Sequence, residues 1–187
     1  MNFPEAWNVI KRIPGWLTRD EALFLFESAQ KTVNLPGVIV EIGSWKGRSA
    51  VALAYGLKSV GTGTIYAIDP CTPFKLKDGT RVHTPPEEFI AQLKRRGVTD
   101  VVVPVIKTSS EAHKQFNDPI KLLYIDGDHS YESALEDYDL WTPHVVKGGI
   151  VVLHDTVSYP GVKKVVETRM ADKDLTRVIE MSAYVED

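Results

Sequence analysis

Four carboxylates of this chain lie at the ends of apolar runs, where their charge could bind a ligand or a metal ion. Glu41 is in the run VIVEIG, Asp69 is in GTIYAIDP, Asp126 follows LLYI, and Asp155 follows VVLH. If these runs are parallel strands of one sheet, their carboxyl ends share the rim at which open α/β sheets bind ligands. Acids at the ends of buried strands are costly unless a partner compensates them. Their recurrence at matching ends therefore favours a functional site over chance turn residues.

The turn EIGSWKGRS, which follows the first apolar run, indicates the charge of the ligand. Gly43 and Gly47 allow a tight turn with backbone close to a ligand, and the helix that follows offers free N–H groups. The dinucleotide fingerprint G-x-G-x-x-G is absent, and Glu41 lies two residues before Gly43. A carboxylate beside the turn disfavours a pyrophosphate and favours a cation. S-adenosylmethionine fits, because it has a sulfonium, an ammonium and a ribose diol, for which Asp69 is suitably placed.

The alternation of apolar and amphipathic runs predicts the fold that positions these residues. It indicates an α/β class, Rossmann-like and doubly wound, with a mainly parallel sheet and helices on both faces. The predicted strands are residues 38–43, 63–70, 100–108, 121–128, 148–155 and 175–185. The predicted helices are residues 48–57, 84–97, 109–116, 130–141 and 161–171, and one more that begins at Thr18.

Two helix starts have the pattern of a capping box. Thr18 precedes Glu21 by three residues, and Thr84 precedes Glu87 by three residues, with Pro85 in the first turn. In this motif the threonine hydroxyl accepts from the backbone N–H of the glutamate, and the glutamate carboxylate accepts from the backbone N–H of the threonine. The pattern therefore predicts helices that begin at Thr18 and at Thr84.

Length and composition predict one domain, with residues 1–35 as an N-terminal helical segment and residues 36–187 as the α/β core. The net charge of −3 favours neither nucleic acid nor an anionic membrane as a partner. The single cysteine, Cys71, excludes an internal disulfide and a cysteine-built zinc site, so we expect a cytoplasmic protein. No apolar run has membrane-spanning length. The irregular segment from Cys71 to His83 is long enough for a lid or binding loop.

Three segments resemble class I S-adenosylmethionine-dependent methyltransferases: EIGSWKGRSAVALA, GTIYAIDP and LLYIDGDHSYESALEDYDLWTPHVVKGGIVVLHDT. The branch that they resemble is the small O-methyltransferase-like family, which includes macrolide-sugar O-methyltransferases and the cephamycin-pathway protein. IPGWLTRDEALFLFESA is similar to the segment before the domain in this branch. The resemblance covers nearly the whole chain. It implies methyl transfer to the oxygen of a small hydroxylated acceptor, such as a sugar or polyphenol.

The resemblance also implies roles for individual residues. The positions that match cofactor contacts are Glu41, Gly43, Ser44, Gly47, Ser49, Asp69, Thr108, Ser109 and Asp126. Thr108 and Ser109 match the adenine region by position rather than by motif. In metal-dependent relatives, residues that match Asp126, His154 and Asp155 bind Mg²⁺, and a histidine that matches His129 is the general base. This chain has His154 where some relatives have glutamate, a departure that bears on the metal.

The chemistry of methyl transfer agrees with these roles. The reaction is a direct displacement, so the protein mainly holds donor and acceptor in line. A sugar or catechol hydroxyl needs a base, or a metal that lowers its pKa. Asp126 and Asp155 offer oxygen ligands, and His129 is three residues after Asp126. Structural alternatives are a turn or capping role for His129 and packing of His154 beneath Asp155.

Two other functions agree with the same residues. One is a Rossmann-like protein that binds S-adenosylmethionine or a nucleotide without methyl transfer, because a fold and a cofactor site do not establish a reaction. The other is a metal-dependent hydrolase in which Asp126, His129 and Asp155 activate water. The acid-first turn argues against the hydrolase. It does not separate a catalyst from a silent binder.

The number of strands bears on the oligomeric state. The resembled fold has seven strands and ends in an antiparallel hairpin, whereas the apolar pattern indicates six. The expected explanations are a truncated chain, a last strand placed differently, or an edge completed by a partner chain. An exposed edge favours pairing with another copy, so we expect a homodimer.

Overall fold

A seven-stranded sheet forms the centre of the computed structural model, which describes residues 1–76 and 78–187. The strand order is β5-β2-β1-β6-β7-β9-β8, and the first five of these strands are parallel. The strands are β1 (Val38–Ile42), β2 (Ile65–Ile68), β5 (Val102–Val105), β6 (Ile120–Ile125), β7 (Val145–Leu153), β8 (Thr176–Val178) and β9 (Met181–Val185). The predicted α/β class with a mainly parallel sheet is confirmed.

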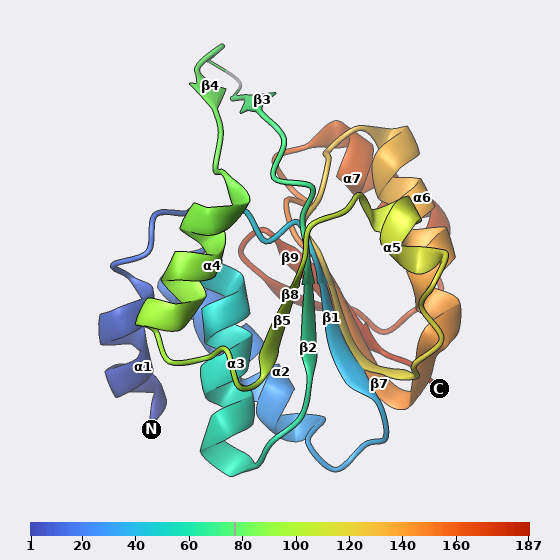
Figure 1. Ribbon diagram of the computed structural model, residues 1–187. Coiled ribbons are helices and arrows are strands. Elements are labelled where there is room, and N and C mark those ends of the chain that lie inside the picture. Colours follow the sequence, from blue (N-terminus) through green and yellow to red (C-terminus); the bar gives the residue numbers. More distant parts are fainter. Residues whose placement is uncertain (77) are drawn as a thin grey trace.

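Helices cover both faces of the sheet, as the doubly wound fold requires (Figure 1). One face packs against α1 (Phe3–Ile10), α2 (Arg19–Lys31), α3 (Arg48–Val60) and α4 (Pro86–Arg95). The other packs against α5 (Ser109–His113), α6 (Tyr131–Trp141) and α7 (Pro160–Arg169), with a 3₁₀ turn η1 (Thr142–His144) after α6. Because β1 and β6 are covered on both sides, their sequences are nearly continuous apolar runs. None of the helices in the described residues is long and apolar enough to cross a membrane.

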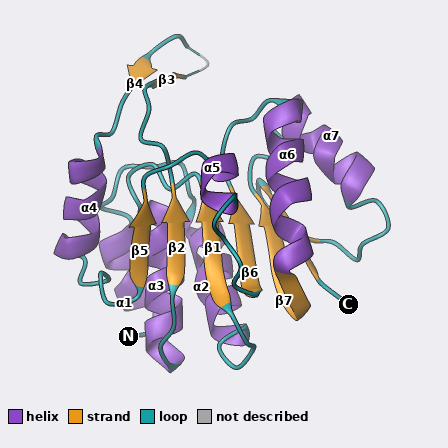
Figure 2. Ribbon diagram, turned by 45° about the vertical axis from the view of Figure 1, so that its right-hand side comes forward, coloured by secondary structure: helices purple, strands orange, loops and turns teal. Residues whose placement is uncertain are grey.

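The strand order places a topological switch point between β1 and β6. From β1 the chain proceeds to β2 and β5 on one side, and then returns to β6 and β7 on the other. Ligands of open α/β sheets bind outside the carboxyl ends of the strands at such a point. The arrowheads of the parallel strands in Figure 2 point to this rim of the sheet.

The two predicted capping boxes have different outcomes. Thr18 caps α2 in a capping box with Glu21, as predicted. Thr84 does not cap α4, because Pro85 is the N-cap and the helix begins at Pro86. A residue before proline is pushed into extended backbone, and Pro85 has ψ 151°. The Pro-Pro pair therefore moves the helix start past Thr84, whose buried hydroxyl has no hydrogen-bond partner among the described residues.

The last predicted strand, residues 175–185, is two strands. β8 and β9 form an antiparallel hairpin, and β9 also pairs antiparallel with β7. Ile179 turns the chain with φ +51°, a value that β-branched residues rarely adopt. The count of six strands was therefore wrong, and of the three explanations offered for it the different placement of the last strand agrees with the structure. The homodimer stays a prediction, without the argument from a missing strand.

The segment from Cys71 to His83 carries a short hairpin within its described residues. β3 (Phe74–Lys75) pairs antiparallel with β4 (Arg81–Val82). Figure 1 shows this hairpin standing above the carboxyl ends of the central strands. Its place beside the rim agrees with the predicted binding loop, and its function stays a prediction.

Candidate active site

The four predicted carboxylates lie along one rim of the sheet. Glu41 is in β1, Asp69 and Asp126 directly follow β2 and β6, and Asp155 is the second residue after β7. Backbone hydrogen bonds join these strand ends: Asp126 N–H donates to Ile42 O (2.8 Å), and His154 N–H donates to Ile125 O (3.0 Å). The parallel register therefore converts residues far apart in sequence into one row of charge.

The turn from β1 to α3 passes directly against the end of β6. Gly43 has φ +87°, and a Cβ there would lie 2.0 Å from the carbonyl oxygen of Asp126. A side chain at this position is excluded, so the turn requires glycine. Gly47, the N-cap of α3, has φ +82° and adds no side-chain cap to the helix. Because no side chain caps the helix, the first N–H groups of α3 are available for an anionic group of a ligand.

Glu41 is fully buried, and no cationic side chain among the described residues pairs with it. Its Oε2 accepts a hydrogen bond from the Ser44 hydroxyl (2.5 Å), while Oε1 has no hydrogen-bond partner among the described residues. Burial raises the pKa of Glu41 to about 7, the Ser44 and Ser49 hydroxyls oppose this shift, and Asp126 and Asp69 add to it. A buried carboxylate oxygen without a donor fits a ligand that brings an ammonium or another donor.

Asp69 is held by two backbone N–H groups, at the place predicted for a ribose. Its Oδ2 accepts from Trp45 N–H (2.7 Å) and its Oδ1 from Cys71 N–H (2.7 Å). Both donors have positive φ, +43° at Trp45 and +54° at Cys71. Such strain in non-glycine residues is frequent at functional sites. Each carboxylate oxygen has two acceptor positions, so Asp69 retains capacity for a ribose diol.

His154 is buried among three carboxylates. Its Nδ1 lies 3.3 Å from Asp126 Oδ1 and 3.3 Å from Asp155 Oδ2, and its Nε2 lies 3.4 Å from Glu21 Oε1. These are ion-pair distances, but neither nitrogen makes an aligned hydrogen bond. Burial alone would lower the pKa of His154, but Asp126, Asp155 and Glu21 outweigh burial and raise the pKa far above 6.5. The surrounding carboxylates therefore favour the imidazolium form of His154, whose positive charge offsets theirs.

Asp126, His154 and Asp155 also have the arrangement of a metal site. One ligand atom from each residue lies within 4.8 Å of the others. The donors are two carboxylate oxygens and one imidazole nitrogen, a set that suits Mn²⁺ or Zn²⁺ better than Mg²⁺, which prefers oxygen ligands only. A metal ligand must be a neutral imidazole, so a metal and a proton compete for His154.

His129 lies beside this cluster and is partly accessible to solvent. Its Nε2 is 2.8 Å from Asp155 Oδ2, an ion-pair distance without an aligned hydrogen bond, and about a third of its side chain is exposed. The ring stacks on Tyr159, with centroids 3.9 Å apart. An imidazole that a carboxylate and a stacked ring hold in place has the arrangement of an oriented base.

Thr108 and Ser109 are not joined to the carboxylates by any contact within the described part of the chain. Thr108 caps α5 in a capping box with Glu111, and the Ser109 hydroxyl accepts a hydrogen bond from Trp141 Nε1 (2.7 Å). Both hydroxyls thus have structural partners. Their predicted contact with adenine stays a prediction.

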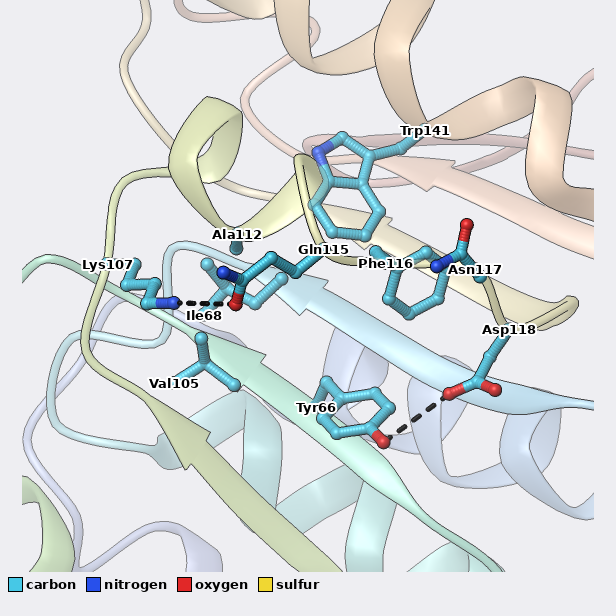
Figure 3. A pocket seen from close by; sticks show the side chains of 10 residues that line it. All are labelled: Tyr66, Ile68, Val105, Lys107, Ala112, Gln115, Phe116, Asn117, Asp118 and Trp141. Atoms are coloured by element: carbon cyan, nitrogen blue, oxygen red, sulfur yellow. Dashed lines mark hydrogen bonds between the residues drawn. The ribbon is translucent and has the colours of Figure 1, made fainter.

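A cavity of about 380 Å³ lies between α5 and the strands β2 and β5, with Trp141 as part of its wall (Figure 3). Tyr66 and Phe116 form part of its wall, with Lys107 bonded to Gln115 at one end. None of its lining residues belongs to the predicted site. The candidate site is therefore identified by its charges and not by this cavity.

Two residues of the site were not predicted as such. Glu21 was predicted only as half of a capping box, yet it is 1% exposed and also accepts from Glu180 N–H (3.0 Å). Tyr124 is fully buried and donates its hydroxyl to Asp126 Oδ2 (2.9 Å). The alternation of strand side chains could have indicated Tyr124, because it precedes Asp126 by two residues. No sequence pattern relates Glu21 to His154.

Residues 40–156 match the model of a family described as "Methyltransferase domain". A relative, "Uncharacterized protein R132" of Acanthamoeba polyphaga mimivirus, is 26% identical over 145 residues, which are 72% of this chain and 61% of that protein. The chain thus spans about three fifths of the length of this curated relative.

Solved methyltransferase structures resemble the whole chain. The calicheamicin methyltransferase CalS11 has a TM-score of 0.68 at 18% identity, covering 98% of this chain and 90% of its own. The O-methyltransferase NovP has a TM-score of 0.68 at 19% identity, covering 97% and 87%. TomG from Streptomyces achromogenes has a TM-score of 0.66 at 16% identity, covering 99% and 89%. At these identities the likeness establishes the fold, which is that of the class I S-adenosylmethionine-dependent methyltransferases. Because the matched family model spans more than half of its residues, this chain belongs to the methyltransferase-domain family.

Proposed function

We propose that this chain transfers the methyl group of S-adenosylmethionine to a hydroxyl oxygen of a small molecule. The observation that carries the proposal is the rim itself. Glu41 presents a buried carboxylate oxygen without a donor, and a few strands away His129 is held against Asp155. A cation-binding half and a base-bearing half thus lie side by side, as a transfer between a sulfonium and a hydroxyl requires. Membership in the methyltransferase-domain family supports this reading.

S-adenosylmethionine supplies an electrophilic methyl group when it is bound. The residues that would hold the cofactor are Glu41 for the ammonium, the first N–H groups of α3 for the carboxylate, and Asp69 for the ribose. Ser44 and Ser49 support Glu41, and Gly43 and Gly47 keep the turn open. Thr108, Ser109 and the backbone beside Asp126 complete the proposed adenosine contacts.

His129 would remove the proton of the acceptor hydroxyl. Because Nε2 faces Asp155, Nδ1 is the nitrogen left to accept the proton. Asp155 keeps the ring oriented and stabilises the imidazolium that forms, as a carboxylate does for other catalytic histidines. The stacked ring of Tyr159 limits rotation of the imidazole.

Asp126, Asp155 and His154 would hold a divalent cation. Such an ion would lower the pKa of an acceptor hydroxyl. Calorimetry with Mn²⁺, Zn²⁺ and Mg²⁺ measures this binding without turnover, and at pH 8 each bound ion should release a proton from His154. Asp126→Asn should abolish the heat of binding, whereas Asp172→Asn, at an exposed position, should not. Absence of heat with all three ions would show that the cluster acts without a metal.

The decisive experiment is ligand binding followed by turnover. In a thermal-shift assay, S-adenosylmethionine and S-adenosylhomocysteine should stabilise the chain and NAD should not, since only a ligand of the native state raises the melting temperature. Stabilisation by NAD alone would overturn the proposal. An acceptor-dependent production of S-adenosylhomocysteine then separates an enzyme from a protein that binds the cofactor without methyl transfer.

A further inference from the structure

We infer that Trp16, Trp45 and Phe74 form an acceptor wall, which selects molecules that present a flat, hydroxylated ring over ring-free alcohols. This inference rests on the proposed function and names the feature of the acceptor that the chain would recognise. It concerns residues to which neither the cofactor nor the metal assigns a role.

The acceptor wall combines three separate segments of the chain. The indoles of Trp16 and Trp45 stack with centroids 4.5 Å apart at an interplanar angle of 22°. Phe74, from β3, meets Trp45 edge to face with centroids 6.5 Å apart. Trp16 is 58% exposed and Phe74 is 40% exposed. Aromatic rings gathered at a surface are a common sign of a binding site, since burial of such rings is strongly favourable.

The wall adjoins the first half of the rim and is linked along the chain to the second. Trp45 follows Ser44, whose hydroxyl donates to Glu41, and the backbone N–H of Trp45 donates to Asp69. Trp16 lies in the connection to α2, and the first turn of that helix carries Glu21, which contacts His154. The segment from Trp16 to Glu21 therefore runs from the cofactor turn to the histidine cluster.

The backbone beside Trp16 is anchored to α3. Arg48, the first residue of α3, donates from its guanidinium to the carbonyl of Gly15, next to Trp16. A cation at a helix amino terminus opposes the helix dipole, so its position there is explained by this anchor and not by helix stability. A preformed aromatic surface binds a flat ring with little loss of conformational freedom.

The wall also holds an unused hydrogen-bond donor. The indole N–H of Trp45 is shielded from solvent and has no acceptor among the described residues. An apolar acceptor would leave this donor unpaired, which is unfavourable. A hydroxylated ring offers both a flat face and an oxygen. A catechol offers a planar ring and a sugar offers an apolar face of C–H groups, each with hydroxyl oxygens, and the experiment distinguishes them.

The test compares three probes in the presence of saturating S-adenosylhomocysteine: catechol, methyl glucoside and ring-free glycerol. In saturation-transfer NMR, the ring protons of a bound probe should give signals. The dissociation constant of one ring probe should be at least tenfold lower than that of glycerol. The probe that binds identifies a phenol or a sugar as the source of the ring. Equal binding of glycerol, or no detectable binding of either ring probe, overturns the inference.

Variants assign the effect to the wall. Trp16→Leu should weaken the binding of the favoured ring probe at least tenfold, and Trp16→Phe should retain most of that binding. Val60→Ala, which changes an equally exposed apolar side chain at the far end of α3, should change nothing. Unchanged binding in Trp16→Leu contradicts the inference. Calorimetry with S-adenosylhomocysteine separates the two proposals. If the wild-type chain does not bind S-adenosylhomocysteine, the proposed function is wrong. If it binds S-adenosylhomocysteine but shows no preference for ring probes, only this inference is wrong.

Discussion

The two halves of the rim hold their carboxylates in opposite ways. In the half formed by β1 and β2, neutral donors surround Glu41 and Asp69: a serine hydroxyl and backbone N–H groups. In the half formed by β6 and β7, two imidazoles lie against Asp126 and Asp155. Burial accordingly raises the pKa of Glu41, whereas the pKa of Asp155 is lowered, because His129 and His154 outweigh the effect of burial.

This difference shows what each half lacks. Among the described residues the buried acid of the first half has no counter-charge, and in the proposed function the cationic cofactor would supply one. The second half carries its own cation in protonated His154, and a metal would have to displace the proton from that imidazole. One rim of charge thus contains a site prepared for an external cation and a site that is already balanced.

The largest effect should come from removing the internal cation. His154→Leu leaves Asp126, Asp155 and Glu21 without their shared partner, and breaking a buried ion pair in this way costs about 3–5 kcal/mol. Urea unfolding measures this loss in the free energy of unfolding. His83→Leu, at an exposed position, should stay within about 0.5 kcal/mol of wild type. Equal stability of the two variants would mean that the second half is not balanced by His154.

The pH dependence of stability should reveal the same cation. The folded pKa of His154 lies above its ordinary value of 6.5, so its contribution is complete below pH 6.5 and is lost as the pH rises toward the folded pKa. Between pH 7 and pH 9 the free energy of unfolding should fall by about 2.5 kcal/mol, at nearly 1.4 kcal/mol per pH unit. His154→Leu should lack this decline. A decline of the same size in the variant would assign it to another group.

Glu41→Gln tests the first half, where the opposite outcome is expected. The pKa of Glu41 is raised from 4.5 to about 7, so ionisation destabilises the folded chain as the pH rises through this window. At pH 8 the neutral variant should be more stable than wild type by about 1–3 kcal/mol. It should nevertheless bind S-adenosylhomocysteine at least tenfold more weakly by calorimetry. Glu27→Gln, on the exposed side of α2, is the matched control. A destabilised Glu41→Gln would show that Glu41 has a counter-charge after all.

The smallest effect should come from a neutral donor in the second half. Tyr124→Phe removes the hydroxyl that donates to Asp126 Oδ2, at a cost of about 1 kcal/mol in the free energy of unfolding. The loss should be much smaller than in His154→Leu, because the cation and not the hydroxyl balances Asp126. Thermal and urea unfolding of both variants measure the two losses in the free energy of unfolding. Similar losses would contradict the proposed dominance of His154.

Most of the fold could be predicted because its signals are local. Buried parallel strands read as continuous apolar runs, and a capping box needs only residues three apart, as at Thr18. The errors arose where a local pattern competed with a stronger constraint. At Thr84 the backbone restriction before proline prevailed over the capping pattern. At Ile179 pairing of β9 with β7 and β8 favoured a turn that the residue itself disfavours.

By itself, the sequence determined which residue types stand at the ends of the strands, because the alternation of strands and helices implies that parallel strands end together. Only the tertiary structure decided which of those residues meet. Glu21 reaches His154 across more than a hundred residues of chain, and Trp16 stacks on Trp45 from a different segment. Such contacts depend on how helices pack against the sheet, and packing is set by the summed burial of many side chains rather than by any local pattern.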